Sequence, residues 1–294
     1  LLYIFHKGNG FPSDKYFIYT EVCIMVIQHN LTAMNANRML NVTTSAQSKS
    51  AEKLSSGYKI NRAADDAAGL SISEKMRSQI RGLNKASDNA QDGISLIQVA
   101  EGALNETHSI LQRMNELATQ AANDTNTSVD RQSIKDEIKQ LNEELDRISS
   151  TTQFNKQDLL TGGFSGKLQV GALEGQTMDV KISLAVSAKG LKVSAVEVST
   201  NAKAGDAMQS IQDAIESVSK QRSKLGAIQN RLEHTINNLD TNAENTQAAE
   251  SRIRDTDMAD EMVQYSKNNI LSQAGQSMLA QANQQTQGVL SLLG

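Results

Sequence analysis

The residues best suited to catalysis or metal binding are scattered along this 294-residue chain. No histidine has the spacing to a cysteine or to paired carboxylates that a metal site requires. The four histidines are His6, His29, His108 and His234. Asp65 and Asp66 could serve as paired acids, but they directly precede an Ala-Ala-Gly stretch. At that place carboxylates favour the first turn of a helix, where they interact with the helix dipole.

The remaining candidates for chemistry have simpler explanations. Glu143 and Glu144, like Asp136 and Glu137, have the pattern of a solvated helix face. Cys23 is the single cysteine and has no partner for a disulfide. No phosphate-binding loop or nucleophile elbow is present in the sequence. The sequence therefore predicts a protein that is not an enzyme and uses no cofactor and no metal.

Composition excludes two further classes of function. The net charge of -4 is mildly acidic, which disfavours nucleic acid as a general partner. No window approaches the run of roughly 20 apolar residues that a membrane span needs, so we expect no membrane insertion. Aromatic residues make up only 3% of the chain, which favours thin helix-on-helix packing over a globular interior.

The elements that organise the chain are long helices. Apolar residues recur every seven positions at Ile211, Val218, Leu225, Leu232 and Leu239, and similar columns run through residues 94–122 and 134–148. This spacing predicts helices over residues 64–122, 128–150 and 203–250. A turn at residues 123–128 makes the first two antiparallel, with Thr127 or Ser128 as the N-cap of the second.

Residues 162–200 have a different pattern. Apolar residues alternate with polar ones at residues 168–172 and again at 180–184, on either side of a turn-like segment at 173–176. Alternation of this kind predicts a β-hairpin, which we expect residues 191–198 to extend. The predicted fold is therefore mainly α: a long antiparallel helical bundle or coiled coil with a small β-hairpin insert, in which the N- and C-terminal helices pair.

Both ends of the chain are helical by pattern and almost free of charge. Arg38 is the only charged residue between positions 25 and 48, and Lys267 is the only one between positions 262 and 294. A solvated helix normally carries a charged outer face, so these ends are expected to be covered by other protein. We predict that they are assembly surfaces, with six apolar assembly residues. These are Leu31, Met34, Leu40, Ile270, Ala274 and Met278.

The first 24 residues differ in composition from the rest and hold the only proline and the only cysteine. They lack the apolar core and cleavage site of a signal peptide. We interpret residues 1–24 as a non-native upstream extension and Met25 as the true start. The alternative is a targeting or anchoring segment.

Several motifs at the two ends resemble those of one family. Residues 54–61 (LSSGYKIN) and 64–69 (ADDAAG) resemble the N-terminal signature of bacterial flagellin. Residues 225–232 (LGAIQNRL), 249–255 (AESRIRD) and 281–285 (QANQQ) are similar to its C-terminal signatures. The resemblance covers nearly all of residues 25–294.

Similarity to flagellin implies a subunit that polymerises into the extracellular bacterial flagellar filament for swimming. It further implies export through the flagellar type III apparatus without a cleaved signal peptide. The partners implied are other copies of the chain, the export apparatus, a flagellin chaperone, and the hook-associated and cap proteins. The short middle of the chain indicates a minimal flagellin without large outer domains.

The resemblance implies a role for each segment after the expected extension of residues 1–24. The inner filament domain would comprise an N-terminal helical segment, residues 25–63, and a C-terminal helix, residues 255–294. The rod-like helical domain would comprise an N-terminal part, residues 64–161, and a C-terminal part, residues 203–254, with the β-hairpin insert at residues 162–202 between them.

A second function is implied by residues 112–118, which resemble the flagellin segment recognised by vertebrate Toll-like receptor 5. Arg113, Leu117 and Glu137 match the family's contact positions, and Gln112 and Glu116 belong to the same segment. The alternative is that Leu117 is a core residue and that the two charged residues support subunit packing.

Thr286 and Gly294 depart from residues often found at the C-terminal end of flagellins, which leaves the strength of receptor signalling open. Two other readings of the whole chain remain at this point. One is a hook–filament junction protein of the flagellum, and the other is a helical signalling coiled-coil protein.

Overall fold

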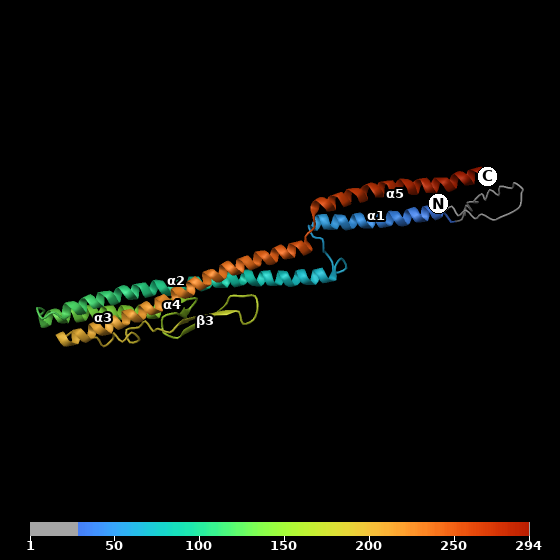
Figure 1. Cartoon of the computed structure of the whole chain (residues 1–294). Helices are drawn as coiled ribbons and strands as arrows, with labels where there is room; N and C mark the ends of the chain where they lie inside the picture. Colours follow the sequence, from blue (N-terminus) through green and yellow to red (C-terminus); the bar gives the residue numbers. More distant parts are fainter. Residues whose placement is uncertain (1–28, 294) are drawn as a thin grey trace, which may run out of the picture. The chain divides into compact units, whose positions relative to one another are not determined.

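The computed structural model describes the backbone of residues 29–293 and the side chains up to residue 285. The interpretation of residues 1–24 as an extension lies outside these residues. Long helices dominate, with two short hairpins between α3 and α4 (Figure 1). The elements are α1 (Leu31–Ser56), α2 (Ala67–Ala121), α3 (Ser128–Thr151), β1 (Gln153–Phe154), β2 (Gln157–Asp158), β3 (Phe164–Gln169), β4 (Thr177–Ile182), α4 (Asn201–Arg254) and α5 (Met258–Leu293).

The chain divides into two compact units. Among the described residues, unit 1 joins residues 29–57 to residues 256–293, and unit 2 comprises residues 58–255. Helix α1 packs on α5 in unit 1, and α2 packs on α4 and α3 in unit 2. The predicted fold class is confirmed: long helices pair, the N- and C-terminal helices among them, and the β structure is small.

The core of unit 2 lies between α2 and α4. Ile97, Leu104 and Leu111 on α2 are fully buried, as are Leu225 and Leu232 on α4. The two helices are antiparallel, because a hydrogen bond joins Ser87 to Asp240 while an ion pair joins Glu101 to Arg222 farther along α2. Heptad spacing therefore creates an apolar seam between α2 and α4, which divides into a large cluster and a smaller one that contains Leu83 and Leu239.

Polar contacts join α2 and α4 near the N-terminal end of α2 and the C-terminal end of α4. Arg254 donates from Nη1 to Glu74 Oε1 at 2.8 Å, and its guanidinium lies 4.8 Å from the centre of the Tyr58 ring. The hydrogen bond from Arg254 holds the pKa of Glu74 below its ordinary value. The carboxylate therefore remains charged in acid solution that would protonate an isolated glutamate.

The hairpin β3–β4 packs against the helices of unit 2. Its antiparallel register pairs Phe164 with Ile182 and Gln169 with Thr177. Alternate residues of β4 are buried, which explains the apolar alternation in the sequence. Gly82 on α2 allows the close approach, since a Cβ there would lie 2.8 Å from the Cβ of Ala172.

The structure corrects the expectation for residues 191–198, which form turns and no strand. Val193 donates its backbone N–H to Ala188 O at 2.9 Å, and Lys192 has a φ of 60°. Leu191, Val193 and Val198 are nevertheless buried. Their apolar character therefore reflects burial in a turn-rich segment and not the alternation of a strand.

The tight hairpin β1–β2 was not predicted. It turns at Asn155 and Lys156, which both have positive φ. A turn of this type requires left-handed backbone at both central residues, and asparagine adopts it readily. The sequence signal for this hairpin was therefore the asparagine at position 155.

Unit 1 is a pair of antiparallel helices. Lys53 lies 3.6 Å from Glu261 at one end, and Asn30 donates to Ala282 O at 2.9 Å at the other. Helix α1 ends at Ser56, and its C-cap Gly57 has a φ of 75°, the left-handed conformation expected of a glycine in that place. Among the helices that the structure describes, none has the length and apolarity needed to cross a membrane.

Candidate functional site

Unit 1 presents apolar side chains to the outside instead of burying them. Leu31, Met34, Ile270 and Met278 are 68%, 63%, 66% and 62% exposed. Within residues 29–57 and 256–285, the only buried residues are two serines, Ser50 and Ser272. The α1–α5 pair therefore has no fully buried apolar side chain in the part of the unit whose side chains are described.

The six predicted assembly residues fall into two groups. Leu31, Met34, Ile270, Ala274 and Met278 are exposed. Leu40 is half-buried and contributes to the seam between the helices, because its Cδ1 lies 3.3 Å from where a Cβ on Gly275 would stand.

A shallow groove runs between the two helices of unit 1. It has a volume of about 430 Å³, and its lining includes Met39, Leu40, Leu271, Ala274 and Met278. Three of the predicted assembly residues therefore contribute to one depression. Exposed apolar surface of this kind is typical of places where another molecule docks.

The receptor-like segment of α2 forms a charged patch with α3. Arg113 donates to Glu137 Oε1 from Nε at 3.0 Å and from Nη2 at 2.9 Å. A third hydrogen bond runs from its Nη1 to Glu116 Oε2 at 3.2 Å. These carboxylates, Glu137 above all, raise the pKa of Arg113. Gln112 is exposed beside them and lies 3.0 Å from His108 Nε2.

Leu117 lies beneath this patch and not on it. Only 2% of its surface is exposed, and it belongs to the apolar core of unit 2. The structure therefore brings Gln112, Arg113, Glu116 and Glu137 together at the surface and places Leu117 under them.

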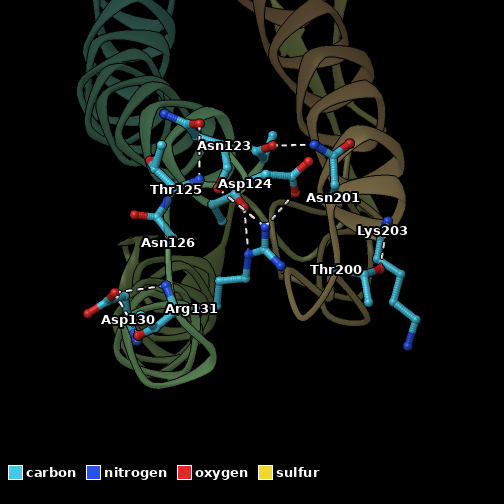
Figure 2. A network of polar contacts seen from close by, with 12 residues as sticks. Asn123, Asp124, Thr125, Asn126, Asp130, Arg131, Thr200, Asn201 and Lys203 are labelled. Atoms are coloured by element: carbon cyan, nitrogen blue, oxygen red, sulfur yellow. Dashed lines mark hydrogen bonds and ion pairs between the residues drawn. The ribbon is translucent and has the colours of Figure 1, made fainter.

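The geometry of the patch depends on the turn between α2 and α3, drawn in Figure 2. Arg131 donates to the carbonyls of Ala121 and Asn123 at 3.1 Å and 3.2 Å and to Asp124 Oδ1 at 3.1 Å (Figure 2). Asn201 at the start of α4 donates to the carbonyl of Ala122. The bonds to the Ala121 and Ala122 carbonyls satisfy acceptors at the C-terminal end of α2, where helix geometry provides no intrahelical donor.

The start of α3 is fixed by a capping box. Thr127, one of the two predicted candidates, is the N-cap and exchanges hydrogen bonds with Asp130. The Thr127 side chain is the main cause of the lowered pKa of Asp130. Sequence reasoning found this cap but missed Arg131, whose partners come from the preceding helix and turn. The only sequence signal for these contacts was the position of Arg131, four residues after the N-cap.

The candidates for chemistry have structural roles. Asp66 caps α2 by accepting from Gly69 N at 2.9 Å, and Asp65 accepts from the backbone N–H groups of Asn61 and Arg62. Glu144 pairs with Arg147, which lowers the pKa of Glu144. No group of three or more His, Cys, Asp or Glu suited to a metal ion occurs among the residues the structure describes. His6 and Cys23 lie outside them.

Comparison with known proteins identifies the family. Residues 27–165 match the bacterial flagellin N-terminal helical region, and residues 208–293 match the bacterial flagellin C-terminal helical region. A flagellin of Halalkalibacterium halodurans is 56% identical over 271 residues, covering 92% of this chain and 100% of the relative. The chain belongs to the bacterial flagellin family.

A second relative agrees with this assignment, and one solved structure shares the fold. A Bacillus subtilis flagellin is 52% identical over 304 residues, covering 92% of this chain and 100% of the relative. A putative flagellar hook-associated protein from Vibrio parahaemolyticus has a TM-score of 0.56 and 14% identity, covering 65% of this chain and 100% of that protein. At that identity the likeness concerns the fold alone.

Family membership establishes the general function. As a flagellin, the chain is a structural, non-enzymatic subunit of the extracellular bacterial flagellar filament, which serves motility. It lacks a large outer domain, since the segment between α3 and α4 contains only the two short hairpins and turns. This assignment is favoured over a hook–filament junction protein or a signalling coiled coil.

Proposed function

We propose that the exposed apolar face of unit 1 is the principal surface through which subunits join in the filament. The observation that carries the proposal is the distribution of buried side chains. Every buried apolar residue among those described lies in unit 2, between Ile60 and Ala243. Unit 1 therefore has to acquire its apolar burial from neighbouring subunits.

The energy available from such burial is substantial. Complete burial of a Leu, Ile or Met side chain contributes about 1.5–3 kcal/mol, and roughly two-thirds of that remains unused at a side chain as exposed as Ile270. Each such residue would then contribute about 1–2 kcal/mol to subunit addition. Few charges oppose burial, because Arg38 is the only charged residue in residues 25–48 and Lys267 is the only one in residues 262–294.

The test is the critical concentration for assembly of an Ile270→Ala variant. Loss of about 1–2 kcal/mol per subunit should raise that concentration by about 5- to 30-fold, measured by sedimentation of seeded filaments. Ile270→Leu keeps the apolar volume and serves as the matched control, with an expected change below about threefold. An Ile270→Ala protein that assembles at the wild-type concentration would refute the proposed surface.

We infer that unit 1 corresponds to the inner filament domain, predicted as residues 25–63 with 255–294, although residues 58–63 and 255 belong to unit 2. Unit 2 would then correspond to the rod-like domain with its hairpin insert. The same apolar face supports a sequence of further partners. A chaperone would cover it before export through the flagellar apparatus, and the hook-associated and cap proteins would contact it at the two ends of the filament. Co-purification of the monomer with each partner, repeated with Ile270→Ala, tests these contacts.

We also propose that the patch of Gln112, Arg113, Glu116 and Glu137 binds Toll-like receptor 5. What supports this is that Arg113 and Glu137, two of the three matching contact positions, form an exposed ion pair between α2 and α3, with Gln112 and Glu116 exposed beside them. Arginine held by two carboxylates is pre-ordered, so little side-chain freedom is lost on binding. Leu117 would contribute by supporting the backbone under Arg113.

A double variant, Arg113→Ala with Glu137→Ala, tests the receptor proposal by direct binding to the receptor ectodomain. Removal of a central arginine anchor typically costs about 2 kcal/mol, so affinity should fall about 30-fold. The matched control is Glu144→Ala with Arg147→Ala, a similarly exposed ion pair on α3 that lies outside the patch. Unchanged affinity of the first variant, or equal loss in both, would reject the assignment.

A further inference from the structure

The methionines of this chain are distributed unevenly between the two units. In unit 1, all five described methionines are exposed, by 48% to 63%. They are Met34, Met39, Met258, Met262 and Met278. In unit 2, Met114 and Met178 are buried, and Met76 and Met208 are half-buried. The proposed assembly surface of unit 1 is therefore also the surface on which thioether sulfur is accessible.

Exposed thioethers react with two-electron oxygen-atom donors such as hydrogen peroxide or hypochlorous acid. With peroxide, the sulfur gives a lone pair to one peroxide oxygen, the O–O bond breaks, and the products are methionine sulfoxide and water. The sulfur is oxidised by two electrons and the peroxide is reduced by two. The flexible apolar side chain becomes polar, with a strong hydrogen-bond acceptor at its end.

The groove of unit 1 offers few donors to satisfy such an acceptor. Met39 and Met278 line it, and the side chains in its lining that could donate are the hydroxyls of Thr32 and Thr43 and the amide of Asn35. The Thr32 hydroxyl already donates to Asn30 Oδ1 at 2.6 Å, and the Thr43 hydroxyl donates to Met39 O at 2.9 Å. A sulfoxide oxygen buried here would therefore lack a hydroxyl donor unless an existing bond were broken.

We propose that the five exposed methionines of unit 1 make filament assembly sensitive to oxidation. Conversion of the monomer's thioethers to sulfoxides blocks incorporation, because the oxidised side chains have to be buried against the next subunit. The assembled filament shields the same sulfurs and is resistant. This inference rests on the proposed assembly role of unit 1.

The experiment uses the full chain, oxidised with hydrogen peroxide to about one sulfoxide per molecule and then seeded with filament fragments. Peptide mass spectrometry compares the sulfoxide fraction at each methionine in the pellet and the supernatant. At the five unit 1 positions the pellet should be depleted about tenfold, the factor that corresponds to about 1.4 kcal/mol. Met76 and Met208, oxidised in the same sample, are internal controls with equal fractions expected in both.

Two further measurements complete the test. Preformed filaments exposed to the same peroxide should oxidise at these five positions at least about tenfold more slowly than monomers, because buried sulfur is inaccessible to the oxidant. Treatment of the oxidised monomer with methionine sulfoxide reductases should restore assembly. Persistent failure to assemble after complete reduction would overturn the proposal.

Equal sulfoxide fractions in pellet and supernatant would overturn the oxidation switch while leaving the assembly surface intact. Failure of the assembly surface has a different readout, since Ile270→Ala would then assemble normally without any oxidant.

Discussion

Excision of unit 1 should leave the fold of unit 2 intact. A protein comprising residues 58–255 retains every buried apolar side chain found in the described residues. The α1–α5 pair lacks such side chains and cannot offset the conformational entropy lost when its backbone is ordered. We therefore expect the protein of residues 58–255 to have the same free energy of unfolding as the intact monomer, within about 0.5 kcal/mol.

The helix lengths set the size of the effect on circular dichroism. Helices α2, α3 and α4 contain 55, 24 and 54 residues, whereas α1 and α5 contain 26 and 36. If α1 and α5 form only on assembly, excision should leave the ellipticity per chain at 222 nm nearly unchanged. The ellipticity per chain at 222 nm should then be about 1.5 times as large in filaments of the intact chain as in its monomers, because ordering is coupled to association.

The assay combines urea unfolding with ellipticity per chain for the excised protein, the intact monomer and the filament. Loss of about a third of the ellipticity on excision would show that α1 and α5 are already helical in the monomer. That result would refute the argument that unit 1 depends on its neighbours. A fall in the free energy of unfolding by more than about 2 kcal/mol would likewise show that unit 1 stabilises unit 2.

Three further predictions concern unit 2. Leu232→Ala, at a fully buried position, should destabilise the monomer by about 2–5 kcal/mol in urea unfolding, whereas Leu173→Ala, 68% exposed, should cost less than about 0.5 kcal/mol; equal effects would contradict the packing described. Gly82→Ala should be about 1–3 kcal/mol less stable than Gly102→Ala, because only the first new Cβ meets the hairpin. Because the pKa of Glu74 is lower in the folded protein than in the unfolded chain, its ionised carboxylate stabilises the fold at pH values above the ordinary carboxyl pKa. This stabilisation is lost as the pH falls through the lowered pKa. Glu74→Gln should therefore weaken the dependence of the unfolding midpoint on pH in the acid range, measured by unfolding at a series of pH values.

Much of the helical architecture could be predicted from the sequence because its signals are local and repeated. The column from Ile211 to Leu239 repeats every seven residues and lies in α4 as expected. Thr127 has both the residue type and the position of an N-cap. Such signals depend on neighbours within one or two turns, which are visible without tertiary information.

The features that were missed depend on contacts distant in sequence or on short segments. Residues 191–198 contain alternating apolar positions, but a run this short has the same pattern whether a strand or a buried turn places it in the core. The exposure of Ile270 and the partial burial of Leu40 could not be distinguished from the apolar pattern, because both residues are apolar members of charge-poor helices. Only the packing of α1 on α5 separates them.

The scarcity of charge and the exposure of apolar side chains in unit 1 have one physical explanation. A helix that is later buried on most sides cannot carry many charges, because desolvating an unpaired charge costs more than apolar contacts return. It also cannot satisfy its apolar residues internally, since those residues have to remain available for the next subunit. In the proposed assembly, ordering of these helices is coupled to association, so their apolar residues are buried only in the polymer. The same arrangement leaves methionine sulfur accessible in unit 1, so the proposed sensitivity to oxidation follows from the proposed assembly surface.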